Sequence, residues 1–180
     1  MPQALLTIGH SNRALEEFGA LLRAHGIQHL ADVRRFPRSR RNPHFSSAAL
    51  EQWLAAQGIG YAHLEALGGH REPRPDSPHF GLATGWMRGF ADHMETPEFV
   101  AALDALLAIA AGRRTAVMCA EADWRECHRR LLADAVVSRG VPVEHVRDAS
   151  HAEPHSATPG IERIGGRLIY RSVAPRLPGL

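Results

Sequence analysis

The stretch TAVMCAEADWRECHRRLLADAV, residues 115–136, decides the fold class of this chain. Its first residues form an apolar run typical of a buried strand, and the segment from Asp123 to Arg139 carries apolar residues at helical spacing. Asp123 and Glu126 have the spacing of a capping box, which predicts that the helix begins at Trp124. A strand joined to a helix by a short polar loop is the building unit of α/β proteins.

The same alternation of strand and helix patterns extends over most of the chain. Short apolar runs and helical spacing predict strands at 5–10, 27–33, 58–64, 114–119 and 141–146, and helices at 14–25, 46–57, 96–111 and 123–139. We therefore predict an α/β fold of three layers, in which a mostly parallel open sheet of about five strands has helices on both faces.

Three segments fall outside this alternation. Residues 67–95 carry no predicted element, and a loop of that length is typical of functional or mobile segments. Residues 148–160 form a polar linker with proline, and Gly165-Gly166 in the next segment predicts the turn of a C-terminal hairpin. We expect a single domain over 1–180, in which 148–180 form the linker and a hairpin packed on the rest.

Composition and charge restrict the classes of function. With 44% hydrophobic residues and a net charge of +2, the chain is typical of globular proteins and carries no global field that demands nucleic acid. No apolar run is long enough to cross a bilayer and the N-terminus lacks signal-peptide features, so we expect a cytoplasmic protein without a membrane partner. All 21 basic residues are arginine, which excludes lysine-based chemistry.

Polar side chains follow the predicted strands at their carboxyl ends, where ligands bind in open α/β sheets. In a parallel sheet these ends meet at one edge, so we expect a site there. The candidate catalytic residues are Cys119, Glu121, His128 and His10, and the candidate substrate-binding residues are Ser11, Asn12, Arg13, Asp32, Arg34, Arg35, Arg40 and Arg129.

The arginine-rich loop 34–41 has three interpretations. Five of its eight residues are arginine, which is compatible with a solvated loop. Guanidinium groups also bind phosphate or carboxylate through paired hydrogen bonds, so the loop is a candidate anion clamp. Phe36 and Phe45 lie among the arginines, and this combination is equally typical of a surface that binds single-stranded nucleic acid.

The two cysteines also have three interpretations. Cys119 and Arg125 fit the C-x5-R spacing of cysteine phosphatases, but Glu121 and Asp123 in the same loop would repel a phosphate dianion.

Cys119, Cys127 and His128 form a candidate zinc site, although C-x7-C-H matches none of the usual ligand spacings and neighbours on a helix point about 100° apart. In a purely structural interpretation, Cys127 lies on the buried stripe of its helix with Leu131 and Ala135, and Cys119 ends a buried strand.

Linked motifs along nearly the whole chain resemble one known family, called domain of unknown function 488. The motifs are TIGHSNR (7–13), DVRRFPRSRRNPHF (32–45), YAHLEALGG (61–69), GFADHM (89–94), CAEADWRECHRR (119–130) and PHSATPGIERIGGRLIY near the C-terminus. His93 stands where the family usually has tyrosine, and His155-Ser156-Ala157 stands where it usually has His-Pro-Leu. The resemblance implies a compact α/β fold and names no activity.

The family pattern C-x-E-x5-C-H-R implies a meaningful set of five residues, which are Cys119, Glu121, Cys127, His128 and Arg129. Arg125 falls outside this pattern, which weakens the phosphatase interpretation.

Three hypotheses follow from these observations. The first is a small enzyme without a cofactor, in which Cys119 is the nucleophile and Glu121, His128 and His10 transfer protons to or from an anionic, phosphate-bearing substrate. The second is a nucleic-acid-binding module that uses loop 34–41. The third is a protein that binds zinc through Cys119, Cys127 and His128. The sequence sets no oligomeric state.

Overall fold

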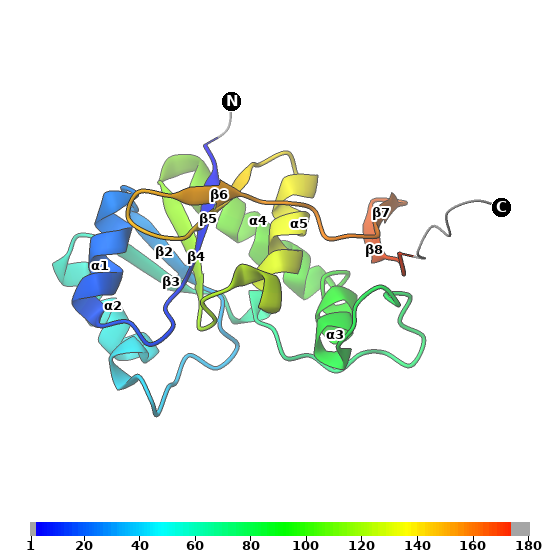
Figure 1. Ribbon diagram of the computed structural model, residues 1–180, viewed down its shortest axis with the longest axis horizontal. Coiled ribbons are helices and arrows are strands. Elements are labelled where there is room, and N and C mark those ends of the chain that lie inside the picture. Colours follow the sequence, from blue (N-terminus) through cyan, green and yellow to red (C-terminus); the bar gives the residue numbers. More distant parts are fainter. Residues whose placement is uncertain (1–2, 174–180) are drawn as a thin grey trace, which may run out of the picture.

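A six-stranded sheet runs through the middle of the protein, in the computed structural model that describes residues 3–173 (Figure 1). The strand order is β3-β2-β4-β1-β5-β6; the first five run parallel, and β6 is antiparallel to β5. The strands are β1 (Leu5–Gly9), β2 (His29–Asp32), β3 (Gly60–His63), β4 (Thr115–Cys119), β5 (Val143–Val146) and β6 (Ala152–Pro154).

Helices cover both faces of the sheet, which confirms the predicted three-layer α/β fold (Figure 1). α1 (Leu15–Ala24) and α2 (Ser47–Ala56) pack on one face, while α3 (Gly85–His93), α4 (Pro97–Gly112) and α5 (Arg129–Ser138) pack on the other. Successive strand residues point to opposite faces, so Met118 joins the core under α1 and Val117 joins the core under α4 and α5.

The C-terminal hairpin forms as predicted. β7 (Ile161–Ile164) pairs with antiparallel β8 (Arg167–Tyr170), and the chain turns at Gly165 and Gly166. Both glycines have positive φ angles, 57° and 82°, which the tight turn requires and side chains disfavour. Tyr170 is fully buried in the core beside α4 and α5 and fastens the hairpin to the rest of the protein.

The helix after β4 begins later than the capping-box pattern predicts, so that prediction was wrong. The Asp123 carboxylate accepts the backbone N–H of Arg125 and caps only a 3₁₀ turn, Trp124–Glu126. Cys127 then has an extended backbone (φ −121°, ψ 153°), which interrupts any helix, and α5 starts at Arg129. As a result, Cys127 and His128 lie in the loop before α5.

Two further elements were not predicted. Segment 67–95 contains α3, and the expected linker 148–160 contains β6. Other 3₁₀ turns lie at Pro43–Phe45 and Glu65–Leu67. Within residues 3–173, no helix has the length and apolar character needed to cross a bilayer.

Candidate functional site

A cavity of about 290 Å³ lies at the carboxyl ends of β2 and β4, at the edge of the sheet where the sequence predicts a site. The cavity draws its walls from the end of β4 and the loop after it, from the arginine-rich loop, and from segment 67–95. Its lining residues are Arg34, Arg35, Phe36, Gly69, His70, Trp86, Cys119, Ala120, Glu121, Cys127 and His128.

The loop after β4 lies tightly against the end of β1. The backbone N–H of His10 donates to the Cys119 carbonyl (2.9 Å), and that of Ser11 donates to the Ala120 carbonyl (2.8 Å). A side chain at position 9 would collide with the Glu121 backbone, so Gly9 is needed for this close approach. These contacts hold Cys119 and Glu121 at the mouth of the cavity.

His128 presents one ring nitrogen to both cysteines. Its Nε2 lies 3.0 Å from the Val33 carbonyl, which can only accept a hydrogen bond, so Nε2 carries the proton. In the neutral ring Nδ1 is therefore an acceptor, and it lies 3.8 Å from Cys119 Sγ and 3.6 Å from Cys127 Sγ. Gly69 leaves room for the ring, because a Cβ there would lie 2.9 Å from His128 Nδ1.

The surroundings of the two thiols shift their pKa values in opposite directions. The hydrogen bond to Cys127, burial and the adjacent Glu121 raise the pKa of Cys119 well above its usual value. Burial alone would also raise the pKa of Cys127. The Cys119 hydrogen bond and the charges of His128 and Arg129 outweigh burial and lower that pKa well below its usual value. Cys119 Sγ also lies 2.9 Å from the Glu121 carboxylate.

Arg129 is 1% exposed and lies behind Cys127 instead of facing the cavity. Its Nε donates to Cys127 Sγ (3.5 Å), and its Nη2 donates to the Glu121 and Ala122 carbonyls. Among residues 3–173 no carboxylate lies within ion-pair distance of its guanidinium. Arg129 therefore stabilises the cysteine loop and does not line the cavity.

A buried hydrogen-bond chain continues from Arg129 into the protein. The Asp134 carboxylate accepts from His155 Nε2 (2.9 Å), and His155 Nδ1 lies 3.0 Å from His145 Nε2. His145 Nδ1 lies 2.7 Å from the Thr7 hydroxyl, which accepts from Arg129 Nη1 (3.4 Å). The directions at the two ends follow because a carboxylate only accepts and a guanidinium only donates. Burial, and next the charge of His155, lower the pKa of His145 to about 3, so its ring is neutral.

Asp32 and Arg34 form a buried ion pair at the end of β2. Asp32 is fully buried, and its carboxylate accepts from Arg34 N, Nε and Nη2 and from the Tyr61 hydroxyl. Asp32, which the sequence predicts to bind substrate, lines neither this cavity nor the adjoining one and orients Arg34, which lines both. His10 Nε2 lies 3.4 Å from Arg34 Nη1, and burial followed by the Arg34 charge lowers the pKa of His10 to about 4.

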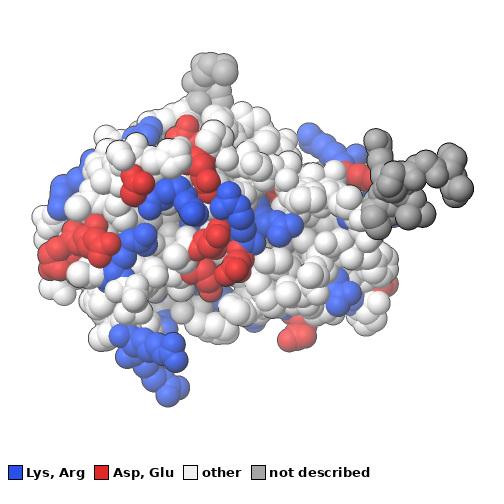
Figure 2. Space-filling model, viewed as in Figure 1, with Lys and Arg blue, Asp and Glu red and all other residues white. Residues whose placement is uncertain are grey.

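A second cavity of about 560 Å³ adjoins the first across Arg34, Phe36 and Ala120. Its other lining residues are His10, Ser11, Asn12, Arg38, Ser39, Arg41 and Asn42. In the space-filling view a group of basic side chains projects at the lower left, where the loop between β2 and α2 protrudes in the ribbon diagram (Figure 2). Two predicted residues lie elsewhere: Arg13 donates to the Gly9 carbonyl and faces another depression, and Arg40 is exposed and lines neither cavity.

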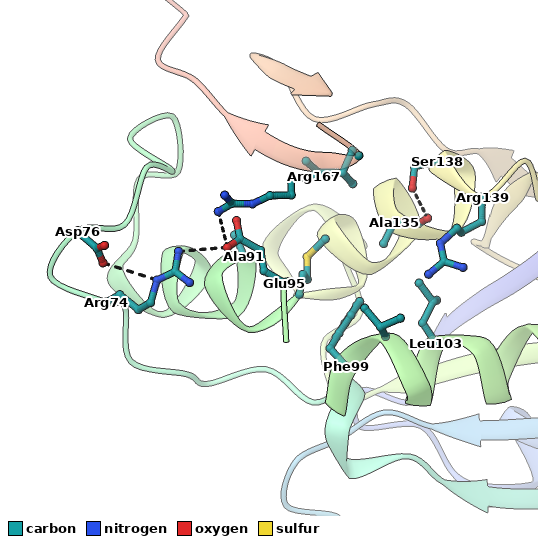
Figure 3. Close-up of a pocket in the computed structure, with 14 residues that line it drawn as sticks. Arg74, Asp76, Ala91, Glu95, Phe99, Leu103, Ala135, Ser138, Arg139 and Arg167 are labelled. Carbon is teal, nitrogen blue, oxygen red and sulfur yellow. Dashed lines mark hydrogen bonds and ion pairs between the residues drawn. The ribbon is translucent and has the colours of Figure 1, made fainter. Parts of the chain in front are cut away.

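The largest cavity, about 640 Å³, lies between α3, α4, α5 and the C-terminal hairpin (Figure 3). None of the predicted site residues lines it. Its charged groups are largely paired with one another, since Glu95 contacts both Arg74 and Arg167. We therefore place the candidate site at the strand ends, where acid–base, sulfur and cationic groups converge.

Several residues of this edge were not among the candidates. Gly69 and His70 could have been predicted from the sequence, because they follow the strand predicted at 58–64. Trp86 could not have been predicted, because it reaches the cavity from α3, and the sequence pattern does not indicate that helix. Thr7 and His145 lie inside strands, where their types alone predict no connection to the cysteine loop.

The fold and the site define an α/β protein with a cysteine–histidine cluster at the carboxyl ends of its parallel strands. The sequence model of one family, Domain of unknown function DUF488, matches residues 14–136, and the chain belongs to that family, as its motifs predict. The matched range includes the arginine-rich loop and the whole cysteine loop. No curated protein and no solved structure matches the chain.

Proposed function

We propose that the protein is a zinc-dependent hydrolytic enzyme that acts on an anionic substrate in the 290 Å³ cavity. One observation carries the proposal: Cys119 Sγ, Cys127 Sγ and His128 Nδ1 all lie within 4.8 Å of one another. Zinc–sulfur bonds of about 2.3 Å and zinc–nitrogen bonds of about 2.0–2.1 Å give a tetrahedral site sulfur–nitrogen separations of about 3.6 Å. The two separations here are 3.8 and 3.6 Å.

The surroundings of the three donors support a metal centre. His128 donates its other ring N–H to the Val33 carbonyl, which is the usual orientation of a metal-binding histidine. Cys127 has an extended backbone, and both Cys127 and His128 precede α5. Their side chains are therefore not held about 100° apart, as neighbours within a helix would be. Both sulfurs line the cavity, which provides access for a fourth ligand.

Three protein ligands and one open position are typical of catalytic zinc sites. Bound there, zinc would supply a coordinated water acidic enough to be a nucleophile near neutral pH. The Glu121 carboxylate, which lies beside Cys119, would accept a proton from the attacking water and return it to the leaving group as the bond to that group breaks. Arg34 lines both this cavity and the adjoining one and attracts the anionic part of the substrate.

The alternative role of Cys119 as a nucleophile has less support. A reactive cysteine is usually partly exposed to reach its substrate, whereas the Cys119 side chain is 5% exposed and its Sγ lies in the donor cluster with Cys127 and His128. Two reduced cysteines as zinc ligands are compatible with the cytoplasm, which we propose as the compartment.

Metal analysis tests this function. We expect protein purified without chelator to carry one zinc ion per chain, and cobalt substitution to produce the charge-transfer absorption of thiolate ligands. Cys127→Ser and His128→Asn should lose the metal, while Arg125→Ala, outside the donor set, should retain it. Folded protein that takes up neither zinc nor cobalt would refute the metal centre. Rapid alkylation of Cys119 at neutral pH in that metal-free protein would favour the nucleophile instead.

A further inference from the structure

We infer that the anionic substrate is a nucleotide unit, with its base in the 290 Å³ cavity and its phosphate in the adjoining 560 Å³ cavity. This inference deepens the proposed function and rests on it for the reaction, but its binding geometry is independent of the metal. The two cavities have different chemistry, and that difference is the basis of the argument.

The smaller cavity has aromatic walls. Phe36, His70 and Trp86 all line it, although they come from the arginine-rich loop, the segment after β3 and α3. The rings of His70 and Trp86 lie 5.6 Å apart at an angle of 30°, and the Phe36 ring is 67% exposed. Exposed aromatic rings beside cationic groups are the usual stacking surfaces for bases. A planar heterocycle is therefore the ligand that these walls fit.

The larger cavity has a polar and cationic lining. Arg38 and Arg41 line it together with Ser39 and Asn42, and within residues 3–173 no carboxylate lies within ion-pair distance of either arginine. Among other exposed arginines, Arg139 is paired with Asp104, whereas Arg113 and Arg163 have no ion-pair partner among residues 3–173. Arg38 and Arg41 differ from those two because they line the same cavity. Unpaired guanidinium groups in a concave surface bind phosphate through paired hydrogen bonds.

The two cavities share Arg34, Phe36 and Ala120, so a single ligand can occupy both at once. The backbone supports this pairing independently. Ser11 (φ 51°) and His70 (φ 57°) are the two non-glycine residues in the left-handed region within residues 3–173. Each lines one of the two cavities, and such strained residues cluster at ligand sites.

Calorimetric titration tests the inference with four probes: adenosine monophosphate, adenosine, inorganic phosphate and a single-stranded octanucleotide. We expect the nucleotide to bind more tightly than adenosine or phosphate. Phe36→Ala should weaken nucleotide binding by about 5- to 160-fold, the range for one lost stacking contact, and leave phosphate binding unchanged. Arg38→Ala with Arg41→Ala should weaken both.

Matched controls are available elsewhere on the surface. Phe80→Ala removes another exposed phenylalanine (71% exposed), and Arg163→Ala removes another exposed arginine; neither residue lines the two cavities, so both variants should bind as the wild type does. Equal affinity for the nucleotide and the octanucleotide identifies a free nucleotide as the ligand. Tighter octanucleotide binding with a steeper salt dependence identifies the unit as part of a strand.

The titrations are repeated on zinc-loaded and chelator-treated protein. Nucleotide binding that persists while no zinc site can be loaded would remove the proposed function and leave this inference intact. Zinc binding without binding of the nucleotide or octanucleotide would overturn the inference and leave the metal centre. A Phe36→Ala variant that binds nucleotide like the wild type would also overturn it.

Discussion

Replacing Asp32 by asparagine tests whether the buried ion pair with Arg34, rather than contact with a ligand, explains the position of Asp32 at the end of β2. The Asp32 carboxylate accepts four hydrogen bonds: from Arg34 N (3.1 Å), Nε (2.9 Å) and Nη2 (2.6 Å) and from the Tyr61 hydroxyl (2.8 Å). Asparagine keeps the shape but removes the charge and one acceptor oxygen. The guanidinium of Arg34, 6% exposed, is then left without its counter-charge.

Breaking one side of a buried ion pair costs about 3–5 kcal/mol. We expect the free energy of unfolding to fall by that amount in urea titrations at pH 7, followed by circular dichroism. Tyr61→Phe removes only one of the four bonds, and it should cost about 1.5 kcal/mol because its acceptor is charged. Asp104→Asn is the matched control, since its pair with Arg139 has a similar distance, 2.9 Å, but is exposed. Its loss should stay under about 1 kcal/mol.

A loss for Asp32→Asn no greater than that for Asp104→Asn would refute the reasoning. If stability were unchanged while ligand affinity fell, Asp32 would be a ligand contact after all. A strong loss of stability with unchanged m-value would confirm that the pair acts in the folded state.

The other predictions concern buried histidines and the cavity wall. His10 and His145 have pKa values lowered to about 4 and about 3, whereas unfolded histidine titrates near 6.5, so the unfolded chain binds protons first on acidification. Their contribution to stability is complete above about pH 6.5 and falls by about 2 kcal/mol per histidine by pH 5; a flat thermal-denaturation profile over pH 7–5 would contradict this. Gly69→Ala places a Cβ 2.9 Å from His128 Nδ1 and should lower zinc affinity about 10- to 100-fold in chelator competition. Gly85→Ala, where nothing lies within 4 Å of the new Cβ, should leave zinc affinity unchanged. A Gly69→Ala variant that binds zinc as tightly as the Gly85→Ala variant would contradict the predicted clash.

Periodicity alone was enough to predict most of the fold. β1 and β4 are apolar runs that are buried along their whole length, and the helices packed on the sheet have apolar stripes or capping residues such as Thr96, which accepts the Phe99 N–H. α3 escaped prediction because its buried Met87, Phe90 and Ala91 lie within a segment rich in glycine and proline. β6 was not predicted because its three residues, one of which is proline, are too few to show the alternation of buried and exposed side chains that indicates a strand.

The site was predictable in position but not in side-chain direction. Parallel strands end at one edge, so Cys119, Glu121 and Arg34 were correctly expected to lie close together. Strand order and side-chain rotamers decide which neighbours face the cavity, and these depend on contacts far along the chain. For that reason Arg129 lies behind the cysteine loop, and Trp86 enters from a distant helix.

The place of β1 in the sheet has a consequence for how the chain folds. β1 precedes its neighbours in the chain but lies in the middle of the sheet, between β4 and β5, and pairs in register with Ala116 to Cys119 and with Val143 to His145. Its hydrogen-bonding partners are therefore synthesised more than a hundred residues later. Contacts of such long sequence separation form slowly, and the emerging chain exposes an unpaired apolar strand meanwhile. Chaperone binding to Leu5–Gly9 during synthesis, ending once β5 is available, is the behaviour that this topology favours.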